Sequence, residues 1–313
     1  MNNITAKIIA HSFVAETGSE IVTFEVTYPR FILPEVLTHR VFSRNTSSSR
    51  AVPSKKMGYW SEKIFYPIHW GKNKAGMSAS EELSGVNLVI SKFLWSTSAA
   101  IAFGLHSILS KLGGHKQWVN RIIEPYVYVK QVITTTELSN FFNLRCHKDA
   151  QPEIQFLANE MYKEYTNTHD CRILDKGDWH LPYIDFDDAG AAHIIDQDEE
   201  ISLQDAILIS VSACAQVSYR ATDFSIEKAR KIFKMLNVFN SDEPIHASPL
   251  EHQATPVIYP ERKNGKWPIG VTHRDRSGKL WSGNFSGYVQ LRHLLEQSST
   301  DEKVDLLGEH VVI

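Results

Sequence analysis

Apolar and polar positions near the start of the chain predict strands first and a helix after them. Residues 5–10 and 20–27 alternate or run apolar and contain several β-branched residues, which predicts two strands. Pro34 suits the first turn of a helix, so we expect a helix that carries Glu35 to Arg40. The stretch from His39 to Lys56 is rich in Ser and Asn, which predicts a loop.

The middle of the chain has helical spacing. Residues 80–112 predict one long helix or two abutting ones, ended by Gly113 and Gly114. A shorter helix is expected at 115–123, before Pro125, and residues 137–167 are again helical in their apolar spacing. Polar residues interrupt the apolar stretch 86–109 more often than in a bilayer-spanning helix, so we expect a buried helix there and no membrane contact.

The second half of the chain mixes irregular and helical patterns. Residues 170–200 are acidic and aromatic without a period, which predicts a long surface loop, and helices follow at 202–217 and 225–237. The last 60 residues predict a turn at Lys263 to Trp267, a strand or hairpin, and a helix near Tyr288 to Glu296. No low-complexity linker divides the chain, so we expect one mixed α/β domain over residues 1–313, made of 1–167, an acidic loop 168–200, and 201–313.

Composition narrows the class of protein. Hydrophobic residues make up 42% and charged residues 22%, as in average globular proteins. The formal charge of −3 provides no overall positive field for general nucleic-acid binding. The start of the chain lacks a secretory signal, and Cys146, Cys171 and Cys214 match neither a zinc site nor a disulfide framework. These features favour a cytoplasmic protein with reduced thiols and no metal.

The predicted loop at 39–56 concentrates positive charge. It holds five Lys or Arg residues and no acid, and Arg40, Arg44 and Arg50 alternate with Ser and Thr hydroxyls. Arginine forks and hydroxyls are the groups that bind phosphate. Composition alone leaves three interpretations open: a solvated loop, a site for a small phosphate ligand, and a nucleic-acid contact.

Five sequence blocks resemble the flavin-dependent thymidylate synthases, the ThyX family. The first is HR-x-x-S-x-N-x-x-S-x-R, formed by His39, Arg40, Ser43, Asn45, Ser48 and Arg50. The others are NRIIEP (Asn120 to Pro125), LSNFFNLRCHKDAQPEIQFLA (Leu138 to Ala158), SACAQVSYR (Ser212 to Arg220) and HASPLEH (His246 to His252). The resemblance implies the ThyX-like fold, a single domain with a central mixed sheet and long flanking helices.

The order of these blocks differs from the family arrangement. In the family, the blocks like SACAQVSYR and HASPLEH come first, but here they follow the arginine motif, while Val22 to Arg40 still runs colinear with the family's next strand and helix. This order predicts a circular permutation, which proteins tolerate when the break lies at the surface. Partial duplication is the alternative, because the tail Asn284 to Leu295 carries Gln290, Arg292 and His293 with nearly the spacing of the family's Q-x-x-RH helix.

The resemblance implies a reaction and its partners. The substrate would be dUMP, converted to dTMP with methylene-tetrahydrofolate as carbon donor and with FAD, reduced by NADPH, as hydride donor. The family uses no covalent enzyme nucleophile, and we expect no Cys here in a basic, activated setting that would attack a pyrimidine ring. The family forms a homotetramer whose flavin sites are built from residues of more than one subunit. The expected ligands are small molecules, the nucleotide and the folate, and no nucleic acid is expected to bind.

The resemblance also assigns residues. Arg145 would be the catalytic residue that stabilises negative charge on the uracil ring; the alternative is an i,i+4 pair with Asp149. The positions assigned to dUMP are Glu35, Thr38, Thr46, Ser47, Ser48, Arg50, Arg121, Arg145, Gln290 and Arg292. The positions assigned to FAD are Thr38, His39, Arg40, Thr134, Thr136, Asn140, Ser248 and Glu251.

Several positions depart from the family pattern. They are Thr38 for the first Arg of RHR, Glu35 for Gln, Thr46 for Glu, Ala51 for Tyr, and Thr134, Thr135 and Thr136 for an Asn-Ala-Arg triplet. Gln290 and Arg292 could supply the missing amide and guanidinium groups. The departures leave open a related one-carbon transfer such as hydroxymethylation, a catalytically silent nucleotide-binding paralogue, and an RNA-binding module that uses the Arg/Ser loop.

Overall fold

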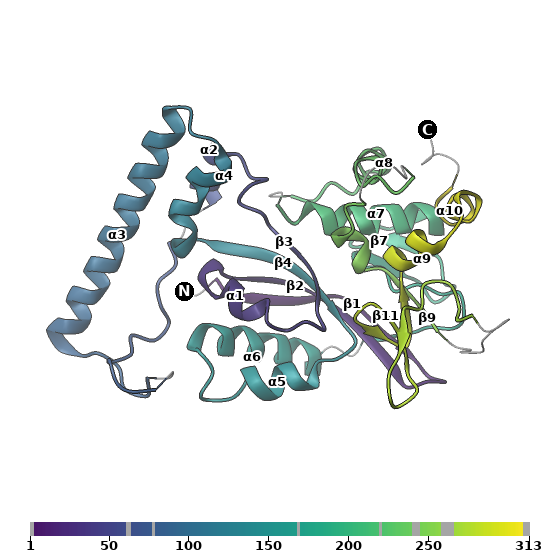
Figure 1. The fold of residues 1–313 in the computed structure, drawn as a ribbon, viewed down its shortest axis with the longest axis horizontal. Helices are drawn as coiled ribbons and strands as arrows, with labels where there is room; N and C mark the ends of the chain where they lie inside the picture. Colours follow the sequence, from purple (N-terminus) through teal and green to yellow (C-terminus); the bar gives the residue numbers. More distant parts are fainter. Residues whose placement is uncertain are drawn as a thin grey trace.

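The computed structural model describes residues 3–60, 64–76, 79–167, 170–218, 221–239, 245–257 and 266–308. Tyr219 and Arg220 of the SACAQVSYR block and residues 263–265 of the predicted turn lie outside these ranges. The described residues form a mixed α/β fold around one five-stranded sheet (Figure 1).

The central sheet is built from the predicted N-terminal strands and three others, in the order β3-β4-β2-β1-β5. The hairpin of β1 (Thr5–Val14) and β2 (Ser19–Pro29) confirms both strand predictions and extends them. β4 (Tyr128–Thr135) pairs antiparallel with β2, and β3 (Ser43–Thr46) pairs antiparallel with β4. The short β5 (Arg172–Ile173) runs parallel to β1, which makes the sheet mixed as expected.

Two helices cover one face of this sheet. α5 (Ser139–Arg145) and α6 (Pro152–Asn167) lie beside the strands in Figure 1, and they are two separate helices within the stretch 137–167 that was expected to be helical. The interruption has a sequence cause, because Pro152 favours the start of a new helix. Phe24 and Val26 of β2 pack in one buried cluster with Ile154 and Leu157 of α6.

The segment around the basic loop differs from the prediction in two ways. After η1 (Arg30–Ile32), α1 (Leu33–Val36) ends four residues before Arg40. The Arg44 side chain donates to the carbonyls of Val36, Leu37 and His39, which satisfies the carbonyl groups at the helix end. Part of the predicted loop is a strand instead, because residues 43–46 pair as β3 with the free edge of β4. The end of the predicted loop overlaps the first turn of α2 (Ser54–Trp60).

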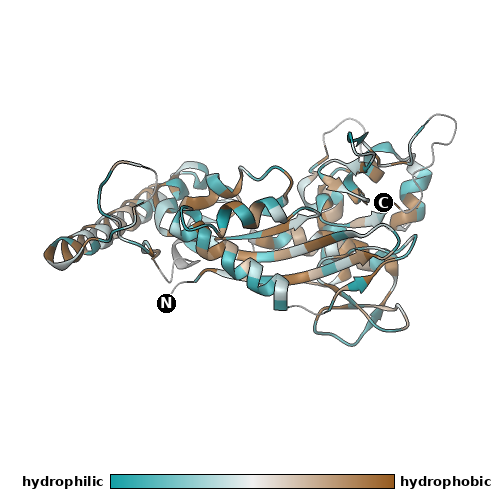
Figure 2. Cartoon of the chain, turned by 90° about the horizontal axis from the view of Figure 1, so that it is seen from below, coloured by the Kyte–Doolittle hydropathy of each residue, from teal (hydrophilic) through white to brown (hydrophobic). Residues whose placement is uncertain are grey.

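The long helix α3 (Gly85–Lys111) is present but is not buried. Only Ala99, Ala102 and His106 are buried within it, and the helix stands away from the sheet in Figures 1 and 2. The expectation of a buried helix was therefore wrong. The helix packs mainly against α2, α4 (Lys116–Val119) and η2 (Asn120–Tyr126), and η2 includes Pro125, beyond the predicted end of the 115–123 helix.

The expected acidic surface loop is partly structured and partly buried. It contains β5 and a three-stranded sheet of β6 (Ile184–Phe186), β7 (Ala192–Ile194) and β8 (Glu200–Ile201). Trp179, Leu181 and Ile184 belong to the core cluster that includes α7 (Leu203–Ala215) and α8 (Ile226–Met235). The prediction failed because short apolar runs, rather than a period, anchor this segment.

The remaining elements complete this second core. The predicted helices near 202–217 and 225–237 are confirmed by α7 and α8. The tail forms α9 (Leu291–Gln297) and α10 (Thr300–Leu307) after two small sheets. The other elements are η3 (Gln216–Ser218), η4 (Ser248–Glu251), β9 (Ala254–Pro256), β10 (His273–Arg274), β11 (Leu280–Ser282), β12 (Phe285–Ser286) and β13 (Tyr288–Gln290).

Candidate active site

Arg145 and His39 meet although they are 106 positions apart in the chain. Arg145 lies in the last turn of α5, and its Nε donates to His39 Nε2 at 2.9 Å. Its second guanidinium nitrogen donates to Thr38 Oγ1 at 3.2 Å, and Thr38 Oγ1 donates to the Glu35 carbonyl at 2.6 Å. The structure thus joins the first and third sequence blocks through the side chain expected to be catalytic.

His39 is held as a neutral acceptor. Its ring is buried edge-to-face against Phe141, with ring centroids 4.9 Å apart. Burial, together with the positive charges of Arg145 and Arg44, lowers the pKa of His39 to about 4. At neutral pH the imidazole therefore orients the Arg145 guanidinium without cancelling its charge. Among the described residues Asp149 pairs with His147, so the alternative i,i+4 pair with Arg145 is absent.

Asn45 joins three of the sequence blocks. Its amide nitrogen donates to the Cys214 carbonyl at 2.5 Å, and its amide oxygen accepts from Ser248 Oγ at 3.3 Å. The SACAQVSYR helix and the HASPLEH turn therefore both contact the arginine motif. Asn45 was part of the motif but had no assigned role, and only the fold shows that it positions the turn.

The tail residues expected to complete the site take separate positions. Gln290 is buried, and its amide donates to Ser43 Oγ at 3.0 Å and to Asn284 Oδ1 at 2.8 Å. Arg292 forms a close ion pair with Glu251 and a second one with Glu296 at 2.9 Å. Arg292 therefore orients Glu251, the glutamate assigned to the flavin, whereas Gln290 contacts β3 through Ser43.

The residues assigned to the phosphate lie in a loop that several hydrogen bonds hold in place. Arg30 donates to the Ser47 carbonyl at 2.9 Å, and the Ser48 hydroxyl accepts from the Arg50 backbone N–H at 3.3 Å. The buried Asn120 side chain donates to the Ser49 carbonyl at 2.7 Å. The Arg50 side chain is exposed, which leaves it accessible to a ligand.

Two further positions assigned to the nucleotide are committed to protein partners. Arg121 donates to Glu124 at 2.9 Å, and Arg30 shares that carboxylate. Thr46 accepts a close hydrogen bond from Gln131, whose amide oxygen accepts from Tyr28 at 2.8 Å. Gln131 lies outside the resembling blocks, so the sequence offered no signal for it.

A buried hydrogen-bond chain crosses the central sheet beneath the site. His180 contacts Ser12 Oγ at 2.9 Å and Thr23 Oγ1 at 2.8 Å, and Thr23 contacts Thr134 at 2.7 Å. Thr134 in turn contacts His252 Nδ1 at 2.8 Å. The fully buried Thr134 hydroxyl, assigned to FAD from the resemblance, is thus occupied by this chain.

The same chain bears on the rearranged order of the blocks. His252 ends the HASPLEH block, and its partner Thr134 pairs across the sheet with Thr23 of β2. A circular permutation requires this block to lead towards β2, and the contact meets that requirement. The permutation itself stays a prediction.

Several polar groups at the site lack protein partners. Among the described residues, Glu35 Oε2 and His252 Nε2 are buried atoms without a hydrogen bond. Arg40 and Asn140 are exposed, and Thr136 accepts from the Ser286 N–H at 3.0 Å and lines a cavity of about 260 Å³. The exposed Arg40 and Asn140 side chains are donors, and donors fit an anionic dinucleotide.

Comparisons with known proteins agree on one family. A family model described as "Thymidylate synthase complementing protein" matches residues 7–169. The flavin-dependent thymidylate synthase of Aquifex aeolicus (strain VF5) is 28% identical over 151 residues, which cover 48% of this chain and 46% of that protein. The chain thus spans about half the length of the curated relative it matches.

Solved structures of one other protein show partial similarity. They are crystal structures of the UMP/dUMP methylase PolB from Streptomyces cacaoi, bound with 5-Br dUMP and with 5-Br UMP. Their TM-scores are 0.43 and 0.42, with 17% and 18% identity. Each alignment covers 53% of this chain, and 91% and 90% of the respective structures.

Proposed function

Because the chain belongs to the thymidylate synthase complementing protein family, we propose that it is a flavin-dependent enzyme that converts dUMP to dTMP. Methylene-tetrahydrofolate would provide the carbon and NADPH the reducing equivalents. The observation that carries the proposal is the convergence of Arg145 on His39 and Thr38, since it places an uncancelled guanidinium within the assembled family motif.

The chain's own residues would hold and polarise the substrate. Arg50 with Ser47 and Ser48 would bind the nucleotide phosphate. Arg145, fixed by the neutral His39, would stabilise negative charge as it develops on the uracil ring, since a preorganised cation lowers the energy of such a charge. The buried Glu35 Oε2 is an unused acceptor suited to an N–H of the base.

Exposed donors beside this site would hold the flavin. Arg40 and Asn140 can donate to phosphate or ring oxygens, the Ser248 hydroxyl can accept a hydrogen bond from the flavin, and Glu251 is oriented by Arg292. FAD, when bound, would supply the hydride that the side chains cannot supply.

Purification and product analysis test the function directly. We expect the protein to purify yellow and, with dUMP, methylene-tetrahydrofolate and NADPH, to release dTMP. A 5-hydroxymethyl product would show that the enzyme catalyses the related one-carbon transfer and not thymidylate synthesis. A colourless protein that binds dUMP without turnover would contradict the proposal and favour a silent nucleotide-binding paralogue.

We propose that the protein is a homotetramer whose subunits cover α3. The helix exposes Val86, Val89, Ile90 and Phe93 at helical spacing, and Phe93 is 67% exposed. By length and composition α3 could also cross a membrane, although a single such helix is weak evidence of that. A second copy of the chain is the better match for this exposed face than a membrane, because the next residues of α3 are held against the chain's own segment. Trp95 Nε1 donates to the Phe65 carbonyl, and Ser96 hydrogen-bonds the Tyr66 hydroxyl. This assembly accords with a cytoplasmic location.

Light scattering tests this assembly. We expect the mass of four chains, and we expect Phe93→Asp to shift it to a smaller species because a buried charge is costly in an apolar interface. Lys92→Asp changes the charge of an exposed neighbour on the same helix and should leave the mass unchanged. A monomer that still holds flavin, or flotation with lipid vesicles, would contradict the proposal.

A further inference from the structure

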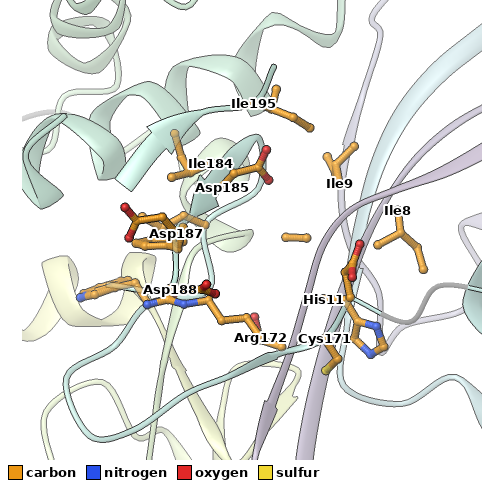
Figure 3. A pocket seen from close by; sticks show the side chains of 16 residues that line it. Ile8, Ile9, His11, Cys171, Arg172, Ile184, Asp185, Asp187, Asp188 and Ile195 are labelled. Carbon is orange, nitrogen blue, oxygen red and sulfur yellow. The ribbon is translucent and has the colours of Figure 1, made fainter. Parts of the chain in front are cut away.

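A second cavity lies outside the candidate active site. It has a volume of about 660 Å³ and lies between β1 and the segment after α6. Ile8 and Ile9 form one wall, and Ile184 and Ile195 form the other (Figure 3). None of the residues assigned to the nucleotide or the flavin lines it.

His11 is fixed at the edge of this cavity. Its side chain is only 7% exposed, and its Nε2 contacts Glu20 Oε1 at 2.6 Å. The Tyr165 hydroxyl donates to the same carboxylate at 2.9 Å, and the two rings lie 5.8 Å apart. Nδ1 of His11 is buried without a normal hydrogen bond among the described residues. The ring is thus oriented by a carboxylate on one side and has an unused nitrogen on the other.

Cys171 is the neighbour of this ring. Figure 3 shows its sulfur beside the His11 imidazole at the cavity wall. Burial lowers the pKa of His11, but Cys171 and Glu20 together raise it more, to about 9. His11 is therefore protonated at neutral pH, and its positive charge lies beside the Cys171 sulfur.

The groups around His11 reinforce this charge state. Glu20 comes from β2 and Tyr165 from α6, and the buried His180 on its other side has its pKa lowered to about 3 by burial and by nearby positive charge. His180 is therefore neutral at the same pH. The other charged side chains that line the cavity are Asp170, Arg172, Asp185, Asp187 and Asp188.

The other two cysteines have different surroundings. Burial raises the pKa of Cys146, and it raises the pKa of Cys214 far above its usual range. Cys214 is also fully buried in the core. Both therefore serve as internal references for the reactivity of Cys171.

We propose that Cys171, His11 and Glu20 form a second reactive site, at which the Cys171 thiolate takes a small disulfide from the cavity. The thiolate attacks one sulfur of the disulfide, so that a new S–S bond forms and the original one breaks. The leaving thiolate takes a proton from the His11 imidazolium. The disulfide is the oxidant, and Cys171 becomes a mixed disulfide while one thiol is released.

Site-resolved labelling of the folded, full chain tests this site. Iodoacetamide and 2-hydroxyethyl disulfide are reacted separately, and mass spectrometry follows the peptide of each cysteine. At pH 6.5 we expect Cys171 to react at least tenfold faster than Cys146 with both reagents, and Cys214 not to react. Between pH 8.5 and 6.5 the Cys171 rate should fall less than threefold, whereas an ordinary thiol slows by about 50-fold.

Variants separate the ion pair from simple exposure. His11→Gln should slow Cys171 at least tenfold at pH 6.5 and little at pH 9.5, where solvent alone removes the thiol proton. His147→Gln, an exposed histidine next to Cys146, should leave the Cys171 rate unchanged. If His11→Gln does not fold, the wild-type pH profile decides. A Cys171 rate no higher than that of Cys146, or a 50-fold fall with pH, would overturn the proposal.

Discussion

Replacing Arg145 by alanine is expected to lower kcat for dUMP turnover by about 100- to 1,000-fold, or about 2.7–4 kcal/mol. The guanidinium has no carboxylate partner among the described residues and is held by the neutral His39, so its charge is available to the substrate. Steady-state kinetics measure the change. The KM for dUMP should change less than kcat, because the charge is needed most in the transition state.

Two variants serve as references for Arg145. Arg50→Ala should raise the dUMP dissociation constant at least tenfold, about 1.4 kcal/mol, because it removes a phosphate contact. Lys148→Ala removes an exposed charge three residues after Arg145 and should leave both constants near wild type. If Arg145→Ala keeps wild-type kcat, the catalytic assignment is wrong.

Lowering the pH from 7 to 4.5 is expected to reduce the free energy of unfolding by on the order of 5 kcal/mol through three buried histidines. Burial, with nearby positive charge, lowers the pKa of His39 to about 4 and that of His180 to about 3, and burial lowers that of His252 to about 3. Below about pH 6.5 the unfolded chain therefore binds more protons than the folded chain. The stabilisation that the three neutral histidines give to the folded chain is complete above pH 6.5. It is lost as the pH falls towards their pKa values in the folded chain.

Urea unfolding at several pH values checks this expectation. His180→Gln should be less stable at pH 7 but should lose less stability between pH 6.5 and 5, whereas the exposed His147→Gln should keep the wild-type slope. His11 acts in a different window: its raised pKa gives stability that is full below pH 6.5 and is lost towards pH 9. Equal wild-type stability at pH 7 and 5 would contradict the account.

Local patterns identified the parts of the fold that depend on neighbouring residues. Alternation identified β1 and β2, and apolar spacing identified α3, α7 and α8. Motif spacing led to His39 and Arg145, which the fold brings into contact. These features were predictable because the residues that define a strand face, a helix face or a spaced motif all lie within one short segment of the sequence.

The features that escaped prediction depend on distant partners. The exposure of α3 could not be predicted, because spacing shows which positions are apolar but not what covers them. His180 and Gln131 had no sequence signal, since their roles come from Thr23 and Thr46 on other elements. Cys171 is followed by Arg172, but the sequence did not single it out, because its partner His11 lies far away on β1.

The contact between Gln290 and Ser43 spans 247 positions of the chain. Loop closure over such a distance costs entropy that only late contacts recover, so folds with many long-range contacts form slowly. During synthesis, β3 and the arginine motif emerge long before Gln290 and the HASPLEH turn that brace them. The nascent chain therefore carries β3 without these supporting contacts until Gln290 has emerged, and a chaperone has most to protect in this interval.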